Sequence, residues 1–222
     1  MGLWLIKAVL FDFDGVLVDS AEINFEAKRR LFLPFGLELS EQEFKELWVS
    51  PSSGKKTGIK YFVKLHGLNA DVQELREKQK PIFVALYREK AELMPGALSL
   101  IKELKAKHLP IAIVSSNHRY NIDVVLQKFN LQRCFDAIIS AEDCNKWKPH
   151  PEPYLKAIKK LGVKPENVLA LEDSIMGVQS AKKAGCKCIA MPNHFTLDED
   201  FSKADLVVKS LAEIDFTILK KL

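Results

Sequence analysis

The sequence lacks a long hydrophobic run and a strong charge imbalance, and each absence excludes a class of protein. No apolar stretch approaches the roughly 18 residues that a membrane span requires, so we expect no membrane partner. The net charge is only +4, from 33 lysines and arginines against 29 aspartates and glutamates. The lysines are scattered and often lie beside glutamates, which is not a nucleic-acid-binding pattern. A small anionic substrate is compatible with this balance.

Cysteine is also scarce, and the beginning of the chain has no leader pattern. The cysteines are Cys134, Cys144, Cys186 and Cys188, and they do not have the spacing of a zinc site. We expect them to be reduced thiols, buried or half-buried. Residues 1–7 contain no basic segment before an apolar stretch, so no signal peptide is predicted and we expect a cytosolic protein.

What is present is an ordinary globular composition arranged largely as alternating strands and helices. Hydrophobic residues make up 47% of the 222 positions and charged residues 28%, which suffices for a buried core and for up to two domains. After residue 92, short apolar runs alternate with helical patterns, which predicts an α/β fold with a doubly wound parallel sheet. The expected strands are residues 8–11, 111–114, 137–139, 168–171, 188–191 and 206–208.

The stretch between the first two of these strands reads as helix after helix, with no convincing strand. Ser40 and Glu43 form a capping-box pattern, which predicts that a helix begins there. The first expected helix starts at Asp19-Ser20. The next ones cover residues 41–48, 59–65 and 71–92, and the last of these is expected to be broken or kinked near Pro81.

These patterns together predict two domains. Residues 1–18 and 93–222 would form the α/β core, and residues 19–92 would form a small helical cap domain inserted after the first strand. An insertion at the carboxyl end of a strand is where a lid over a site belongs.

An apolar run followed by two aspartates organises the chain. Residues 8–11 have the length and flanks of a buried strand, and Asp12 and Asp14 follow it with one residue between them. Side chains alternate along a strand, so both carboxylates would emerge on the same side, and Gly15 permits a sharp turn away. Two such carboxylates repel each other unless a cation binds them or one stays protonated. The alternative is an ordinary strand-end aspartate that caps the next helix.

Polar residues also stand at the ends of later strands and in one loop. Ser115 follows the second strand, Glu172 and Asp173 follow the fourth, and Lys148 lies in a loop between them. In a parallel sheet such ends face one edge, so these groups together have the composition of a magnesium and phosphate site. Each of these residues also has an ordinary interpretation when it is considered alone. Ser115 would be the N-cap of a helix, Lys148 would be a solvated surface lysine, and Glu172 and Asp173 would be an N-cap pair for the next helix.

This set of motifs resembles the haloacid dehalogenase superfamily, in particular its β-phosphoglucomutase and phosphoglycolate phosphatase-like branch. The matching stretches appear in family order and run from Asp12 to Ser20, from Val114 to Asn117, from Lys148 to Tyr154 and from Glu172 to Ser174, followed by Gly177, Ala181, Ala184 and Gly185. The resemblance implies a Rossmann-like core with a helical cap. It covers most of the chain, but over residues 20–92 it is architectural only.

The resemblance also implies a role for each acid. Asp12 would be the nucleophile that forms an aspartyl-phosphate. Asp12 and Asp173 would bind Mg²⁺ through their carboxylates and Asp14 through its backbone carbonyl, since hard oxygen ligands suit this ion. The Asp14 side chain would then act as general acid and base. Glu172 would either contact the metal ion or support the metal ligands from outside the coordination sphere, and the supporting role is favoured.

The remaining motif residues would bind the phosphoryl group. Ser115 would hydrogen-bond a phosphoryl oxygen, with help from the backbone N–H groups of Ser116 and Asn117. Lys148 would neutralise the phosphoryl charge and keep Asp12 ionised. With Mg²⁺ as cofactor, the expected partner is a small phosphorylated metabolite, bound by a monomer or homodimer with no nucleic-acid partner.

Several activities remain open at this stage. A phosphatase is favoured over a phosphosugar mutase, because the family's mutases have a histidine ten residues after the second aspartate, where this chain has Asn24. A dehalogenase would not need Asp14, and a silent binding module would have lost the catalytic residues. Lys55 and Lys56 stand either in a substrate loop or in a solvated basic loop. Phosphoglycolate, sugar phosphates and nucleotides all stay possible substrates.

Overall fold

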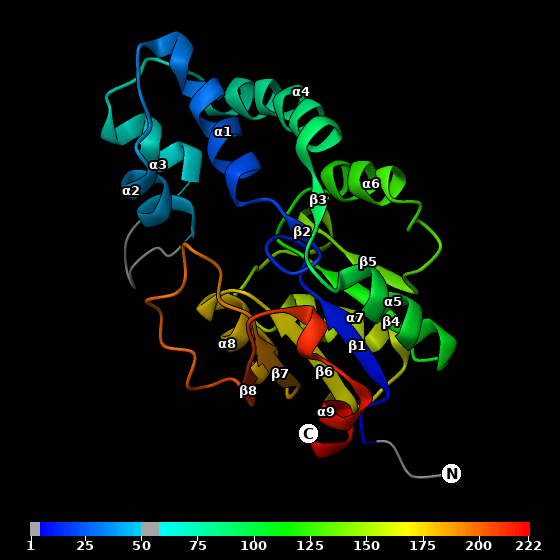
Figure 1. Cartoon of the computed structure of the whole chain (residues 1–222). Helices are drawn as coiled ribbons and strands as arrows, with labels where there is room; N and C mark the ends of the chain where they lie inside the picture. Colours follow the sequence, from blue (N-terminus) through cyan, green and yellow to red (C-terminus); the bar gives the residue numbers. More distant parts are fainter. Residues whose placement is uncertain (1–4, 50–57) are drawn as a thin grey trace. The chain divides into compact units, whose positions relative to one another are not determined.

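The structure is a computed structural model, and it describes residues 5–49 and 58–222 (Figure 1). The chain divides into two compact units, one of Met1–Asp19 and Glu92–Leu222 and the other of Ser20–Ala91. Lys55 and Lys56, named above as a possible substrate loop, lie outside the described residues.

The first unit is built on a sheet of six parallel strands. Their order across the sheet is β5 (Ala137–Ile139), β4 (Ile111–Val114), β1 (Ala8–Phe11), β6 (Val168–Glu172), β7 (Lys187–Ala190) and β8 (Leu206–Val207). The first strand of the chain therefore lies in the interior of the sheet, and the chain is wound outward from it in both directions. The expected doubly wound α/β fold is confirmed.

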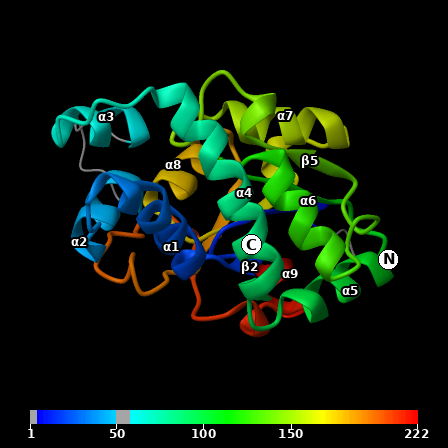
Figure 2. The same cartoon turned by 90° about the horizontal axis from the view of Figure 1, so that it is seen from above.

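Helices cover both faces of this sheet. They are α5 (Ala97–Ala106), α6 (Arg119–Lys128), α7 (Glu152–Leu161) and α8 (Ile175–Lys183), with α9 (Phe216–Lys221) at the end of the chain. Figure 2 shows α7 and α8 on one side of the sheet and α5 and α6 on the other. The strands read as continuous apolar runs because both of their faces are buried.

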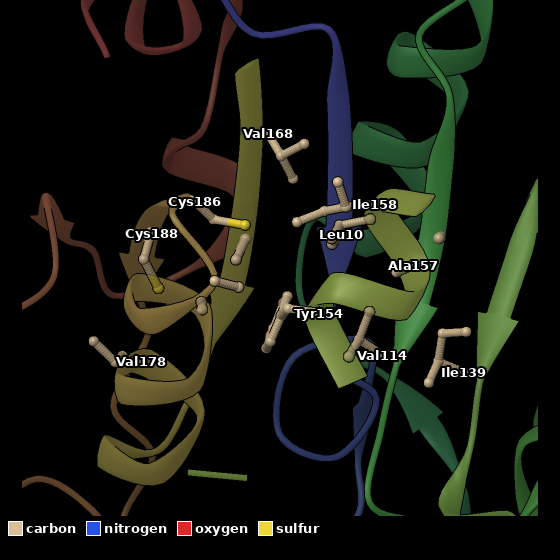
Figure 3. Close-up of a cluster of buried hydrophobic side chains, with 14 of the residues drawn as sticks. Leu10, Val114, Ile139, Tyr154, Ala157, Ile158, Val168, Val178, Cys186 and Cys188 are labelled. Carbon is tan, nitrogen blue, oxygen red and sulfur yellow. The ribbon is translucent and has the colours of Figure 1, made fainter. Parts of the chain in front are cut away.

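Alternate strand residues meet the apolar stripe of α7 and α8 in one hydrophobic cluster (Figure 3). Leu10 and Val114 point from the sheet toward Tyr154 and Ile158 on α7, and all four are buried. Cys186 and Cys188 belong to the same cluster, Cys144 is buried as well, and Cys134 is half-buried. All four cysteines are free, which confirms the expectation of reduced thiols.

The second unit consists of helices, as the pattern predicted. They are α1 (Ala21–Phe32), α2 (Glu41–Phe44), α3 (Gly58–Leu65) and α4 (Val72–Lys90). The capping box of Ser40 and Glu43 is present, and the helix it starts continues as a π-helix over Lys45–Val49. Helix α4 passes through Pro81 without a break. None of the described helices combines the length and the apolar character that crossing a membrane requires.

One prediction for this region is wrong, because two short strands flank the helices. β2 (Val18–Asp19) and β3 (Glu92–Leu93) pair antiparallel, with Val18 opposite Leu93 and Asp19 opposite Glu92. Strands of two residues are too short to show a periodic pattern, so the sequence does not reveal them. Their pairing assigns Asp19 and Glu92 to the first unit rather than to the helical insertion.

Candidate active site

The sheet brings the motif residues together at the carboxyl ends of β1, β4 and β6. Phe11 is paired with Ile113 on one side and with Leu171 on the other, so the next residue of each strand emerges at the same edge. The backbone N–H of Asp12 donates to the carbonyl of Leu171 at 2.9 Å, which joins the ends of β1 and β6 directly. Parallel sheets bind their ligands at this edge.

Lys148 lies at the centre of the site. Its ammonium nitrogen Nζ is 2.9 Å from Asp12 Oδ1 and 2.7 Å from Glu172 Oε1. The lysine side chain is only 6% exposed and the glutamate side chain is fully buried. Lys148 is therefore a buried counter-ion for two carboxylates, and the alternative of a solvated surface lysine is wrong.

Glu172 supports this lysine and is itself held by a tyrosine. Tyr154, on α7, donates its hydroxyl hydrogen to the same oxygen, Oε1, that faces Lys148. Burial, and next the charge of Glu172, raise the pKa of the Tyr154 phenol well above its usual range, so the phenol stays a hydrogen-bond donor. The second carboxylate oxygen of Glu172 points toward the backbone of Gly177 on α8. The sequence motif included Tyr154, but a tyrosine in an amphipathic helix reads as core, and its partner was not predicted.

Asp173 stands beside the first strand and is bound by the loop that follows β7. Asn193 Nδ2 donates to Asp173 Oδ2 at 2.7 Å, and the hydroxyl of Thr196 donates to the Asp173 carbonyl at 3.0 Å. Gly15, with φ of +73°, makes room for this carboxylate, because a Cβ there would lie 1.9 Å from Asp173 Oδ2. The left-handed backbone conformation and the close approach of the Asp173 carboxylate both explain why a glycine follows the two aspartates.

Asp14 is held by the residues after β4. Asn117 Nδ2 donates to the two carboxylate oxygens of Asp14 at 3.3 and 3.0 Å. The amide oxygen of Asn117 accepts from Asn121 Nδ2 at 2.7 Å and from the backbone N–H of His118 at 2.8 Å. These two donors fix which end of the amide faces Asp14. Asn117 was predicted to bind substrate, and its observed partner is the second aspartate.

Ser115 and Ser116 occupy different environments. Ser115 is buried, and its hydroxyl oxygen accepts from the backbone N–H of Asn117 at 2.9 Å. Ser116 is exposed. Helix α6 begins with His118 at its N-cap and α8 with Ser174, so neither Ser115 nor the acidic pair caps a helix. The ordinary alternatives that the sequence left open for these residues are therefore wrong.

The charges of the site are unbalanced in favour of the acids. Burial, and next the charge of Glu172, raise the pKa of Asp12 well above its usual range, although Lys148 opposes the shift. The same two causes raise the pKa of Asp173. Burial alone would lower the pKa of the Lys148 ammonium, but Asp12 and Glu172 outweigh it and the pKa rises. The positive charge of Lys148 therefore does not balance the negative charges of the surrounding carboxylates, and binding of a further cation at this site would be favourable.

These carboxylates fit a divalent metal ion. Oxygen atoms of Asp12, Glu172 and Asp173 lie within 4.8 Å of one another, and such hard donors suit Mg²⁺. Since Glu172 already pairs with Lys148 and Tyr154 through Oε1, it is better placed to support the site than to bind the ion.

A family model described as haloacid dehalogenase-like hydrolase matches residues 9–191, which is most of the chain. The chain belongs to the haloacid dehalogenase-like hydrolase family. Hexitol phosphatase B of Escherichia coli is 31% identical to it, over 94% of this chain and 94% of that protein. Two crystal structures of CbbY from Rhodobacter sphaeroides are similar at 30% identity.

The CbbY structure with phosphate has a TM-score of 0.89 and covers 98% of this hydrolase and 100% of its own chain. The structure with xylulose-(1,5)bisphosphate has a TM-score of 0.86, with 94% and 96% covered. The likeness thus extends over both units of this haloacid dehalogenase-like chain, which is an enzyme of the phosphoric monoester hydrolase class.

Proposed function

We propose that the protein is a Mg²⁺-dependent phosphatase that hydrolyses a small phosphorylated sugar or sugar alcohol through an aspartyl-phosphate. The observation that carries the proposal is the position of Asp12, which lies 2.9 Å from a buried lysine in a cluster of carboxylates. The names of the relatives, a hexitol phosphatase and a protein bound to xylulose-(1,5)bisphosphate, support the substrate class.

Asp12 is the nucleophile in this proposal. Its Oδ1 accepts from the backbone N–H of Phe13 at 2.6 Å and faces Lys148, so we assign the attack on phosphorus to Oδ2. A carboxylate needs no general base to activate it, but an anionic phosphate repels it. Lys148 reduces that repulsion and favours the ionised form of Asp12, because its charge opposes the rise in the Asp12 pKa. Attack forms the Asp12–phosphorus bond and breaks the bond between phosphorus and the leaving oxygen.

Asp14 moves the protons of both half-reactions. Its carboxylic acid donates a proton to the leaving oxygen, and the resulting carboxylate removes a proton from the water that attacks the phosphorus. The second step releases inorganic phosphate and restores both aspartates. Asn117 holds the Asp14 side chain by donating to it, so the carboxyl group is oriented before the substrate arrives.

The metal ion would be held by Asp12 and Asp173 through carboxylate oxygens and by Asp14 through its backbone carbonyl. When bound, Mg²⁺ supplies positive charge that offsets the repulsion between the nucleophile and the phosphoryl oxygens. We assign Ser115, which is buried after β4, to donate its hydroxyl hydrogen to a phosphoryl oxygen. We assign Ser116 to the same subsite through its backbone N–H group, whereas the backbone N–H of Asn117 is already used as a donor to Ser115 Oγ. Glu172 and Tyr154 keep Lys148 in place.

Hydrolysis is favoured over phosphoryl transfer to a second sugar by the residue at position 24. Asn24 lies on α1, and its amide donates to the carbonyl of Ser20 at 2.9 Å. An amide does not exchange protons near neutral pH, unlike the histidine at the corresponding place in the mutases that the sequence resembles. We assign selection of the leaving group to the helical insertion and place the protein in the cytosol, where its four thiols stay reduced.

The proposal is tested by measuring phosphate release from a panel of sugar phosphates, hexitol phosphates, phosphoglycolate and nucleotides. We expect release from one class well above the rest with Mg²⁺, none with EDTA, and recovery when Mg²⁺ is restored. The Asp12→Asn variant should be inactive while folded. Turnover by this variant would contradict the aspartyl-phosphate route. Conversion of β-glucose 1-phosphate with a sugar 1,6-bisphosphate primer, without net phosphate release, would establish a mutase instead.

A further inference from the structure

The loop after β7 forms a turn that is locked by its own hydrogen bonds. The backbone N–H of Asn193 donates to the hydroxyl of Thr196 at 3.0 Å, and the N–H of Thr196 donates to the carbonyl of Asn193 at 2.9 Å. The side-chain oxygen of Asn193 accepts from the backbone N–H of Phe195 at 2.8 Å. Phe195 and Thr196 are both buried. The turn, residues 193–196, therefore has a defined shape on which its side chains are fixed.

This turn contacts a single residue of the acidic cluster in two places. The Asn193 amide nitrogen donates to the Asp173 carboxylate, and the Thr196 hydroxyl donates to the Asp173 backbone carbonyl. Because the Asn193 oxygen is occupied by Phe195, the amide has to present its nitrogen to Asp173. The Thr196 hydroxyl accepts from the Asn193 N–H, and its hydrogen has a closer acceptor in the Asp173 carbonyl, at 3.0 Å, than in the Asn193 carbonyl, at 3.4 Å. Both contacts are therefore determined by the turn itself.

The carboxylate of Asp173 is also enclosed from the other side. The atoms nearest to a Cβ built on Gly15 are Asp173 Oδ2 at 1.9 Å, Asp173 Cγ at 2.7 Å and Asn193 Nδ2 at 3.2 Å. The glycine backbone and the asparagine amide thus both border Oδ2. With this oxygen committed, the other carboxylate oxygen of Asp173 is the one left to coordinate an ion.

We infer that Asn193 and Thr196 are positioning residues for the metal ion, which orient Asp173 so that its Oδ1 is presented to the ion. The inference rests on the magnesium site of the proposed function. Partners that hydrogen-bond a metal ligand fix its orientation, and their loss typically weakens metal affinity by about 10- to 100-fold. Both side-chain contacts described here join the turn to Asp173, so we expect the turn to act through this residue.

The test measures Mg²⁺ affinity of the full chain directly, by isothermal titration calorimetry without substrate. We expect Asn193→Ala to raise the Mg²⁺ dissociation constant by about tenfold or more. Asn167→Ala is the matched control, because Asn167 donates one comparable hydrogen bond, to the Leu5 carbonyl at 2.8 Å, next to the opposite end of β6. The control should bind Mg²⁺ as the unmodified protein does.

The threonine supplies a second arm. Thr196→Val keeps the shape of the side chain but removes both its donor to Asp173 and its acceptor for the Asn193 N–H, whereas Thr196→Ser keeps both. We expect the valine variant to bind Mg²⁺ more weakly and the serine variant to retain most of the affinity. Circular dichroism establishes that each variant is folded, and if Asn193→Ala does not fold, the threonine pair alone decides.

Asp173→Asn separates this inference from the proposal on which it rests. If Asp173→Asn binds Mg²⁺ as the unmodified protein does, the metal site itself is wrong. If Asp173→Asn loses Mg²⁺ but Asn193→Ala and Thr196→Val retain it within about twofold, the metal site stands and the positioning role is overturned. Loss in Asp173→Asn together with weakening in both turn variants supports the inference.

Discussion

Replacing Gly177 by alanine gives the sharpest test of the buried network, because helix propensity and structure predict opposite results. Gly177 lies in α8, where alanine would ordinarily stabilise a helix by about 1 kcal/mol. In this structure a Cβ at position 177 would lie 1.8 Å from Glu172 Oε2 and 2.1 Å from its Cδ. Glu172 is fully buried and cannot move into solvent, so the methyl group must displace the carboxylate.

The magnitude follows from what Glu172 contacts. Displacing it separates the 2.7 Å pair with Lys148 and the hydrogen bond from Tyr154. Breaking a buried ion pair costs about 3–5 kcal/mol, and subtracting the gain of about 1 kcal/mol in helix propensity leaves a net loss of about 2–4 kcal/mol. At roughly 2–4 °C per kcal/mol for a chain of this size, we expect Tm to fall by on the order of 10 °C.

Thermal unfolding followed by circular dichroism measures this effect, and kcat measures its consequence at Lys148. Gly162→Ala is the control, because Gly162 also lies in the first unit, has φ of +65° and has no atom within 4 Å of a Cβ built there. The Gly162→Ala variant should lower the free energy of unfolding by only about 1–2 kcal/mol, which is the cost of a non-glycine residue in the left-handed conformation, and it should leave kcat unchanged. A Gly177→Ala variant that is as stable as the unmodified protein, or more stable, would refute the close approach to Glu172.

Three further predictions concern groups around the site. Lys148→Met should lower kcat by on the order of 10²-fold, as removal of one preorganised charge does. Asn117→Ala should lower kcat by about tenfold or more, and by less than Asp14→Asn, which removes the proton donor and should cost on the order of 10²–10⁴-fold. Glu142 is half-exposed, and burial would raise its pKa, but hydrogen bonds from His118 and from the backbone outweigh it and lower the pKa from 4.5 to about 2. Its contribution to stability is therefore present above about pH 4.5 and is lost as the pH falls toward 2, so Glu142→Gln should lower Tm at pH 7 but not at pH 2.

The lysine prediction has a control variant, and each of the three predictions has a contrary outcome. Lys78→Met removes an exposed lysine paired with Glu74 and should leave kcat unchanged. An unchanged kcat in Lys148→Met would mean that the buried lysine has no part in the chemistry. If Asn117→Ala has the kcat of the unmodified protein, its contact with Asp14 is dispensable. A Tm difference for Glu142→Gln that is the same at both pH values would contradict the lowered pKa.

The sequence predicts the elements that have a strong local pattern. All six strands of the main sheet appear where the apolar runs predicted them, and the capping box at Ser40 begins the helix that was expected. Asp12 and Lys148 are far apart in the sequence, but they were expected to meet because parallel strands end at one edge of the sheet. In the structure, Lys148 Nζ lies 2.9 Å from Asp12 Oδ1. The parallel topology thus brings together, in one site, residues whose separate sequence motifs are each weak evidence of function.

What the sequence does not reveal are contacts that depend on a loop's own fold. Asn193 and Thr196 stand in an irregular loop after β7, where neither periodicity nor a motif distinguishes them from ordinary turn residues. The partner of Asn117 was missed because an amide after a strand suits a phosphate as well as a carboxylate. In both cases the residue type indicated a hydrogen-bonding role, and only the three-dimensional structure identifies the partner.

The antiparallel pairing of Val18 with Leu93 and of Asp19 with Glu92 has a consequence for how such a chain changes over time. The chain leaves the α/β core at Asp19 and returns to it at Glu92, and these two residues are paired. The segment between them is therefore connected to the core in the same way as the loop of a β-hairpin is connected to its two strands. A short turn between Asp19 and Glu92 would satisfy the same ladder. The inserted segment can therefore be lengthened, shortened or exchanged without altering the register of the six-stranded sheet. With the selection of the leaving group assigned to this segment, as we propose, new specificities can arise while the chemistry is conserved.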